Sequence, residues 1–259
     1  MKKTAMKIIK YLPNKIKRYI IGDIRNQLEK IKIVQEAMLE MMTSNIIPGF
    51  QNIRFRGQVK QDLYAYIFFN GKREGFFIDI GAHDGRTINN TYLFEQIGWT
   101  GICVEPQPDI FDRLKQNRNC DVYNVAIGNE TRDDVEFIKA TGVDMLSVLN
   151  SDMTEDHRKR IERNNGKTEK IKIRMLTFQE LMKHYPEKTY IDFISIDVEG
   201  SEMNVLKSIN FNEYTFGLLT IENNTGCKSM ENEMIKYMDA QGYEVLHDLG
   251  LDLMFVRKQ

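Results

Sequence analysis

Phe-Phe-Ile-Asp-Ile-Gly-Ala-His-Asp-Gly, at residues 76–85, has the pattern of a strand that runs into a glycine turn. The apolar run carries Asp79 near its end and is followed by Gly81 and Gly85. A buried strand that ends in such a turn and opens into a helix is typical of the nucleotide-binding edge of an α/β sheet. Glycine lets the backbone approach a ligand closely and adopt a turn that a Cβ atom would obstruct. We therefore expect a ligand site where this strand ends.

The turn lacks the glycine pattern of a dinucleotide site. In the G-x-G-x-x-G fingerprint a second glycine follows the first after one residue, and here His83 holds that position. A loop built to cradle a pyrophosphate is therefore not predicted. A carboxylate beside the turn suits a ligand with a positive charge or free hydroxyl groups, such as S-adenosylmethionine.

The chain after residue 50 alternates between predicted strands and helices. The strands are expected at 76–80, 101–105, 121–127, 134–138, 191–197, 216–222, 243–247 and 252–257. The helices are expected near 58–70, 88–97, 108–117, 177–184, 201–208 and 228–241. Because several strands are apolar throughout, the pattern indicates an α/β fold with a doubly wound, mostly parallel sheet. Gly250 lies in a connection short enough for an antiparallel hairpin between the last two strands.

The sequence predicts an N-terminal helical extension, residues 1–47, and a main domain, residues 48–259. A helix is expected over 14–42, where apolar residues recur at helical spacing. These residues are Ile24, Leu28, Ile31, Val34, Met38 and Met41. The seam predicts self-association into a homo-oligomer, with a basic membrane-surface helix or a docked extension as the alternatives. Within the main domain, the polar residues 139–174 are expected to form an insertion that serves as a lid or acceptor-side loop, or else plain surface.

Charge is unevenly distributed along the chain. The 259 residues carry a net charge of −1 and are 42% hydrophobic, which fits a globular protein. Residues 1–30 hold nine Lys or Arg against Asp23 and Glu29, a net +7, so the remaining residues carry −8. The acidic body argues against a nucleic-acid partner, whereas the basic extension is compatible with peripheral contact at the inner membrane face.

The cysteines and the apolar runs indicate a cytoplasmic protein. Cys103, Cys120 and Cys227 form neither a zinc-binding pattern nor a disulfide framework. No stretch approaches the roughly 20 apolar residues that span a bilayer. A reducing cytosol is therefore the expected location.

Seven short motifs follow one another in the main domain. They are Gly57–Asp62 (GQVKQD), Phe77–Gly85 (FIDIGAHDG), Asn90-Thr91, Gly98–Gly101 (GWTG), Val104–Pro108 (VEPQP), Asn124–Gly128 (NVAIG) and Ser195–Glu202 (SIDVEGSE). Together and in this order they resemble the FkbM family of S-adenosylmethionine-dependent methyltransferases, over about residue 55 to the C-terminus. The resemblance implies the seven-stranded, Rossmann-like sheet of class I methyltransferases, S-adenosyl-L-methionine as cofactor and O-methylation, often of a sugar or related hydroxyl.

The cofactor site is expected along the ends of the first strands. Gly81 and Gly85 would face the amino acid portion of S-adenosylmethionine, and Asp79 would bind its ammonium group or else hold its own turn. Glu105 ends the second strand, where two carboxylate oxygens match two ribose hydroxyls, and Pro106 stiffens this corner.

Four further residues are expected near the cofactor. Asn124 and Ala126 close the third strand, where adenine would lie. Gln58 and Asp62 are four residues apart on the predicted first helix, which puts them on one face. In the family this helix covers the cofactor, and a solvated polar face is the alternative.

Acidic residues after the next two strands are the candidates for catalysis. Asp197, Glu222 and Asn223 offer oxygen ligands from adjacent strand ends and form a candidate site for Mg²⁺ or Mn²⁺. Without a metal ion, Asp197 or Glu199 would act as general base, with His247 as a further candidate. The alternative is that these acids stabilise the N-terminus of the following helix.

These features predict an S-adenosylmethionine-dependent O-methyltransferase whose acceptor is a hydroxyl of a sugar, nucleotide-sugar or glycan. Two other functions stay open: an NAD-dependent dehydrogenase, and a non-catalytic nucleotide-binding scaffold that oligomerises through its N-terminal helix. The missing second glycine argues against the dehydrogenase. The presence of Asp79, Gly81, Glu105 and Asp197 argues against a scaffold that has lost catalysis.

Overall fold

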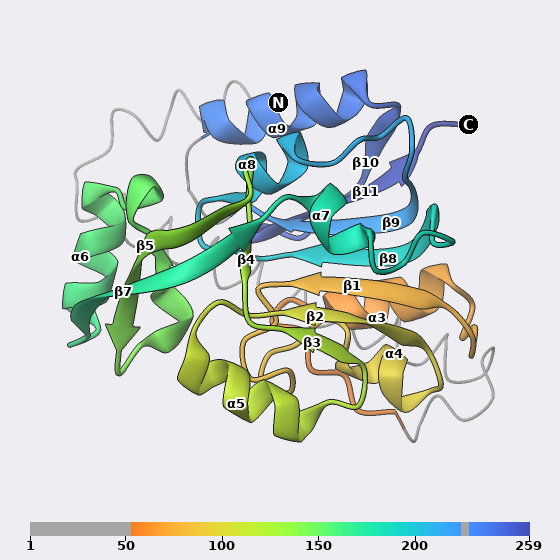
Figure 1. The fold of residues 1–259 in the computed structure, drawn as a ribbon. Coiled ribbons are helices and arrows are strands. Elements are labelled where there is room, and N and C mark those ends of the chain that lie inside the picture. Colours follow the sequence, from red (N-terminus) through yellow and green to blue (C-terminus); the bar gives the residue numbers. More distant parts are fainter. Residues whose placement is uncertain (1–52, 224–227) are drawn as a thin grey trace, which may run out of the picture. The chain divides into compact units, whose positions relative to one another are not determined.

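The computed structural model describes residues 53–223 and 228–259. Residues 54–259 form one unit, which is built on two β-sheets (Figure 1). The helix expected over 14–42, and with it the extension 1–47, lies outside the described residues. In the part of the chain that the structure describes, no helix is long and apolar enough to cross a membrane.

The larger sheet has seven strands in the order β10-β11-β9-β8-β1-β2-β3. Their bounds are β1 Phe76–Ile80, β2 Thr100–Val104, β3 Asp121–Tyr123, β8 Tyr190–Ile196, β9 Thr215–Glu222, β10 Tyr243–Asp248 and β11 Asp252–Arg257. β3, β2, β1, β8 and β9 pair in parallel, whereas β11 is antiparallel to both β9 and β10. The predicted fold class, a doubly wound parallel sheet that ends in an antiparallel hairpin, is confirmed.

Helices cover both faces of this sheet (Figure 1). On one face lie α3 (Gln61–Phe68), α4 (Tyr92–Gln96) and α5 (Pro108–Asn117). On the other face lie α7 (Phe178–Met182), α8 (Glu202–Lys207) and α9 (Lys228–Ala240). Because both faces are covered, every residue of β1 is buried, which explains why its sequence is an apolar run without alternation.

A second sheet of four strands, in the order β4-β7-β5-β6, lies beside the first. Its region contains β4 Ala126–Ile127, β5 Arg132–Thr141, η2 Asp144–Leu146, β6 Val148–Leu149, η3 Asn150–Asp152, α6 Glu155–Arg163 and β7 Lys167–Leu176. The expected strand 121–127 is therefore divided between the two sheets. The stretch 139–174, expected to be a loop, contains regular structure along most of its length.

The second sheet has its own small apolar core. Ile173 and Met175 of β7 pack with Phe137 of β5 and Leu149 of β6. Arg174, between them on β7, is charged and exposed, so one side of the strand is buried and the other is solvated. This core holds the strands of the second sheet together.

Candidate functional site

The parallel register brings the carboxyl ends of four strands to one edge of the large sheet. Ile80 pairs with both Val104 and Ile196, and Ile196 pairs with Ile221. The residue after each of these therefore lies at the same edge. Those residues are Gly81, Glu105, Asp197 and Glu222, and all four line one cavity of about 220 Å³.

Gly81 is required by the close packing of this edge. Its φ is +87°, and a Cβ atom there would lie 1.8 Å from the carbonyl oxygen of Asp197. The N–H groups of Gly81 and Ala82 both donate to the carbonyl oxygen of Val104, each at 3.0 Å. The turn thus touches both neighbouring strands and keeps their ends together.

Glu105 is held in the pocket wall by two backbone N–H groups. Its carboxylate accepts from His83 at 3.0 Å and from Gln107 at 2.9 Å. The residue is only 4% exposed, and burial raises the pKa of Glu105 to about 7. Each carboxylate oxygen keeps a lone pair beyond these bonds, so the group can accept further hydrogen bonds from ligand hydroxyls. Pro106 follows Glu105 in the same wall, as expected.

Asp79 points away from the pocket. Its carboxylate accepts hydrogen bonds from Asn89 at 2.8 Å and Thr91 at 2.6 Å, and the residue is 2% exposed. Burial raises the pKa of Asp79, and the Arg118 guanidinium opposes that rise. The expected direct contact of Asp79 with a cofactor is not supported by this geometry, which matches the alternative that the residue holds its own turn.

Gly85, at the end of the same turn, packs against the residues at the end of α5. It has a φ of +72°, and a Cβ atom there would lie 2.4 Å from Leu114 of α5 and 2.7 Å from Arg118, which directly follows α5. Its carbonyl oxygen accepts a hydrogen bond from Arg118 at 3.2 Å. Gly85 is therefore needed for packing against α5 and does not line the pocket.

The shared helix face expected for Gln58 and Asp62 does not form. Lys60 takes a left-handed conformation with φ +68°, so α3 begins only after it. Asp62 is fully buried and accepts a hydrogen bond from the backbone N–H of Arg56. Of the two candidates, Gln58 alone lines the pocket.

The part of the pocket wall on the Glu105 side is apolar. It consists of Val104, Val125, Ala126, Ile127, Phe137 and Leu149. Ala126 lines the pocket, but it belongs to β4 of the second sheet and not to the third strand of the large sheet, where it was expected. Asn124 lies outside this pocket and donates to the carbonyl oxygens of Glu105 at 2.9 Å and Pro106 at 3.1 Å, which stiffens the corner after β2.

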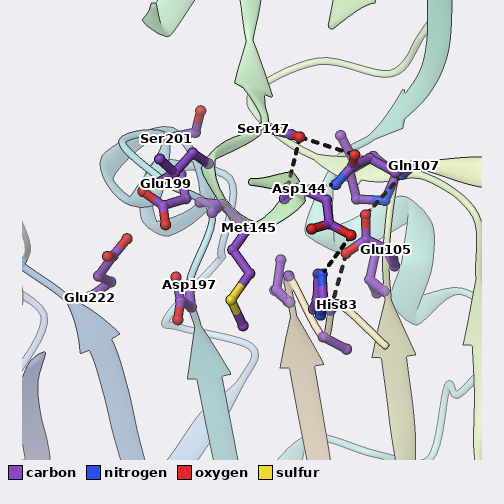
Figure 2. Close-up of a pocket in the computed structure, with 18 of the residues that line it drawn as sticks. His83, Glu105, Gln107, Asp144, Met145, Ser147, Asp197, Glu199, Ser201 and Glu222 are labelled. Carbon is purple, nitrogen blue, oxygen red and sulfur yellow. Dashed lines mark hydrogen bonds and ion pairs between the residues drawn. The ribbon is translucent and has the colours of Figure 1, made fainter. Parts of the chain in front are cut away.

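Three carboxylates meet at the opposite end of the pocket from Glu105 (Figure 2). One oxygen from each of Asp197, Glu199 and Glu222 lies within 4.8 Å of the others. Burial and the Glu222 charge raise the pKa of Asp197 well above its usual range, and the same causes raise the pKa of Glu199 to about 8. The carboxylates therefore do not all ionise at neutral pH unless a cation compensates them. Arg160 of α6 supplies part of that compensation, at 3.3 Å from Glu199.

A fourth acid near this end of the pocket, Glu202, has structural partners. Glu202 accepts from the backbone N–H groups of Val198 at 3.2 Å and Gly200 at 2.9 Å, so it stabilises the start of α8. Burial raises the pKa of Glu202 to about 8. The helix-stabilising role considered for the whole acidic group thus fits Glu202 but does not account for the other three.

Two of the catalytic and metal-ligand candidates also lie outside the pocket. Asn223, an expected metal ligand, does not line it, whereas Glu199 lies close to Asp197 and Glu222. His247, an expected alternative base, lies on the edge strand β10 with its ring centroid 5.0 Å from that of Tyr64. The structure therefore does not place His247 where it could act on a ligand in this pocket.

Several pocket residues were not singled out from the sequence. They are Gln107, Asp144, Met145, Leu146, Ser147, Arg160 and Ser201. Gln107 joins the two sheets, because its side chain donates to the carbonyl oxygen of Asp144 at 3.0 Å and accepts from Ser147 at 3.0 Å. The polar composition of 139–174 indicated an acceptor-side segment, but it did not identify the individual side chains that reach the pocket.

Residues 79–245 match the model of the methyltransferase FkbM domain. No curated protein is similar enough in sequence to be matched with the chain. Among solved structures, the METTL16 methyltransferase domain is 12% identical, with 85% of this chain and 79% of that chain covered and a TM-score of 0.43.

Two further solved structures are similar at the same level. Magnesium protoporphyrin IX methyltransferase from Synechocystis PCC 6803 with bound SAM is 9% identical, with coverage of 76% and 78% and a TM-score of 0.41. A methyltransferase from Geobacter sulfurreducens is 11% identical, with coverage of 96% and 98% and a TM-score of 0.40. Similarity at this level does not identify an acceptor.

Proposed function

This chain belongs to the FkbM family of methyltransferases and is an S-adenosylmethionine-dependent enzyme, and on that premise we propose that it methylates a hydroxyl of a sugar, nucleotide-sugar or glycan. One observation carries the proposal. A single pocket extends from Glu105, past the Gly81 turn, to the carboxylates of Asp197, Glu199 and Glu222. The first end suits the donor, and the second suits a hydroxylated acceptor.

The donor is proposed to lie along the ends of β1 and β2. Its amino acid portion would pass over the Gly81 turn, where no side chain intervenes. The two ribose hydroxyls would donate to Glu105, whose carboxylate is already oriented by two backbone N–H groups. Adenine would pack against the apolar wall that contains Val125 and Phe137.

The acceptor hydroxyl is proposed to approach from the acidic end. Its oxygen attacks the methyl carbon in line with the sulfur, the carbon–sulfur bond breaks, and the sulfonium becomes the neutral thioether of S-adenosylhomocysteine. The hydroxyl proton passes to Asp197 or Glu199. Their raised pKa values make them better proton acceptors than ordinary carboxylates, provided that the group is ionised when the acceptor binds. Alignment of the two reactants contributes about 7–11 kcal/mol to catalysis in well-oriented systems.

A divalent cation, Mg²⁺ or Mn²⁺, is the proposed alternative to a carboxylate base. Asp197, Glu199 and Glu222 supply hard oxygen ligands, and their oxygens lie close enough together to share one ion. When bound, such an ion lowers the pKa of a coordinated hydroxyl. Arg160 contacts the Glu199 carboxylate at 3.3 Å, so this carboxylate would be shared between the guanidinium and the ion.

The test of the proposal is methyl transfer from radiolabelled S-adenosylmethionine to a panel of acceptors. The panel contains methyl glycosides, oligosaccharides and nucleotide-sugars, with phenols and RNA as acceptors of other classes. Label in a carbohydrate hydroxyl supports the proposal. Label found only in a phenol or RNA would show that the acceptor belongs to another chemical class. Preferential binding of NAD in calorimetry would favour the dehydrogenase alternative.

A further inference from the structure

Met145 occupies a central place in the pocket. It lies on η2, is 37% exposed, and reaches into the pocket between Asp197 and His83 (Figure 2). The donor end with Glu105 is on one side of its side chain, and the acidic end is on the other. An unbranched thioether adapts its shape to whatever packs against it, so methionine is well suited to a surface that meets a ligand.

The backbone on either side of Met145 is fixed. The carbonyl oxygen of Asp144 accepts from Gln107 at 3.0 Å, which ties η2 to the end of β2. The carbonyl oxygen of Leu146 accepts from His157 of α6 at 2.7 Å, which ties η2 to the second sheet's helix. A side chain on a fixed backbone keeps its position relative to both ends of the pocket, although its own rotamers can change.

His83 marks the donor side of Met145. Both of its ring nitrogens are buried without a hydrogen-bond partner among the described residues. The shortest approach is between Nε2 and the Asp144 carboxylate, at 3.6 Å, which is longer than a hydrogen bond. A buried unpaired polar group costs about 1–3 kcal/mol, so a polar group of a ligand that reached this ring would relieve that cost.

We infer that Met145 forms the boundary between donor and acceptor and limits the size of the acceptor. The inference rests on the proposed function, because it takes the acidic end as the acceptor side. A side chain between the two ends must pack against the bound donor and must also face any group that approaches the methyl. Shortening it would enlarge the acceptor side and remove a contact that small acceptors use.

The first test does not need an acceptor. The chain has 14 methionines, and their methyl groups can be labelled with ¹³C and observed by NMR. Met145→Leu assigns the Met145 signal by its loss, and Met230→Leu assigns a control on α9 that is 41% exposed and does not line the pocket. Saturation with S-adenosylhomocysteine should shift the Met145 signal and leave the Met230 signal in place. An unmoved Met145 signal in the presence of bound S-adenosylhomocysteine would overturn the inference.

The second test measures acceptor size. Met145→Ala should raise the ratio of kcat/KM for a trisaccharide over the matching monosaccharide by about tenfold, the lower end of the discrimination that one methylene gives in a hydrophobic pocket. Met230→Ala should leave that ratio unchanged. An unchanged ratio in Met145→Ala would overturn the role in size selection and leave the proposed function intact. Activity only on non-carbohydrates would refute the proposed acceptor class. The ratio of kcat/KM for large over small acceptors of the class that is methylated would then decide the role of Met145.

Discussion

Glu105→Gln tests the donor site through its dependence on pH. Burial raises the pKa of Glu105 to about 7 in the free protein. Ribose hydroxyls donate to the ionised carboxylate, so donor binding favours the charged form and affinity should rise as pH rises through 7. If the bound carboxylate titrates below pH 6, S-adenosylhomocysteine should bind about tenfold more weakly at pH 6 than at pH 8, since one pKa unit corresponds to about 1.4 kcal/mol.

The variant should lose both affinity and pH dependence. Glutamine keeps one acceptor oxygen but replaces charged hydrogen bonds, each of which contributes about 1.5–3 kcal/mol. At pH 8 the variant should therefore bind S-adenosylhomocysteine at least about tenfold more weakly than the wild type. The new amide NH₂ would also face the N–H of either His83 or Gln107, since the two carboxylate oxygens each accept one of them.

Calorimetry from pH 6 to 8 in two buffers of different ionisation enthalpy provides the assay. Wild-type protein should release a fraction of a proton on binding near pH 7, and Glu105→Gln should release less. Glu244→Gln, an exposed change on β10, serves as the matched control and should behave as wild type. The reasoning is refuted if wild-type affinity is flat from pH 6 to 8, or if the variant binds equally well while remaining folded.

Three further predictions follow from the same geometry. Asp197→Asn should lower kcat by about 10²-fold or more, which is the usual contribution of a proton acceptor. Its affinity for S-adenosylhomocysteine, measured by calorimetry, should be unchanged. A variant that retains the wild-type kcat would exclude Asp197 as the base. Gly81→Ala should lower the free energy of unfolding by about 4 kcal/mol or more, measured by thermal or urea unfolding, because the new Cβ clashes with a carbonyl oxygen. The control Gly142→Ala, at φ +86° with no atom within 4 Å, should lower it by only about 1–2 kcal/mol. Equal losses of stability in the two variants would contradict the packing argument. Mn²⁺ at a hundredfold excess over its Kd should stabilise the wild type by about 2.7 kcal/mol and should not stabilise Glu222→Gln; full activity after exhaustive chelation would remove the cation from the proposal.

The main sheet was predictable because its strands are buried on both faces. The runs at 76–80 and 191–196 carry apolar residues on both faces of the strand, interrupted only by Asp79, Asp192 and Ser195, which favours central strands of a parallel sheet. Of the second sheet, the expected strand 134–138 lies within β5, but β7 was not predicted. Along Lys170–Met175, isoleucine and methionine alternate with lysine and arginine, a two-residue period that indicates a half-buried strand. The density of charge in this region concealed that signal.

The direction of individual side chains was harder to predict. Asp79 and Glu105 each follow or end an apolar strand, yet only Glu105 lines the pocket. The difference depends on Asn89, Thr91 and Arg118, which come from separate segments and meet Asp79 only in the folded protein. A spacing in the sequence does not reveal such partners.

Local backbone conformation accounts for another difference. Gln58 and Asp62 would share a helical face if the helix began at residue 58, but the left-handed Lys60 delays its start. His247 likewise lies near the end of a correctly predicted strand, β10. That strand is at one edge of the sheet, and β11, β9 and β8 separate it from β1. The strand could be predicted from local pattern, whereas its distance from the pocket required the sheet order.

A crystal structure of the protein with S-adenosylhomocysteine would test the central claim most directly. The account predicts the ribose hydroxyls within hydrogen-bond distance of Glu105 and the sulfur directed toward Asp197. Ribose away from Glu105, or the ligand bound anywhere other than the edge formed by β1 and β2, would contradict it.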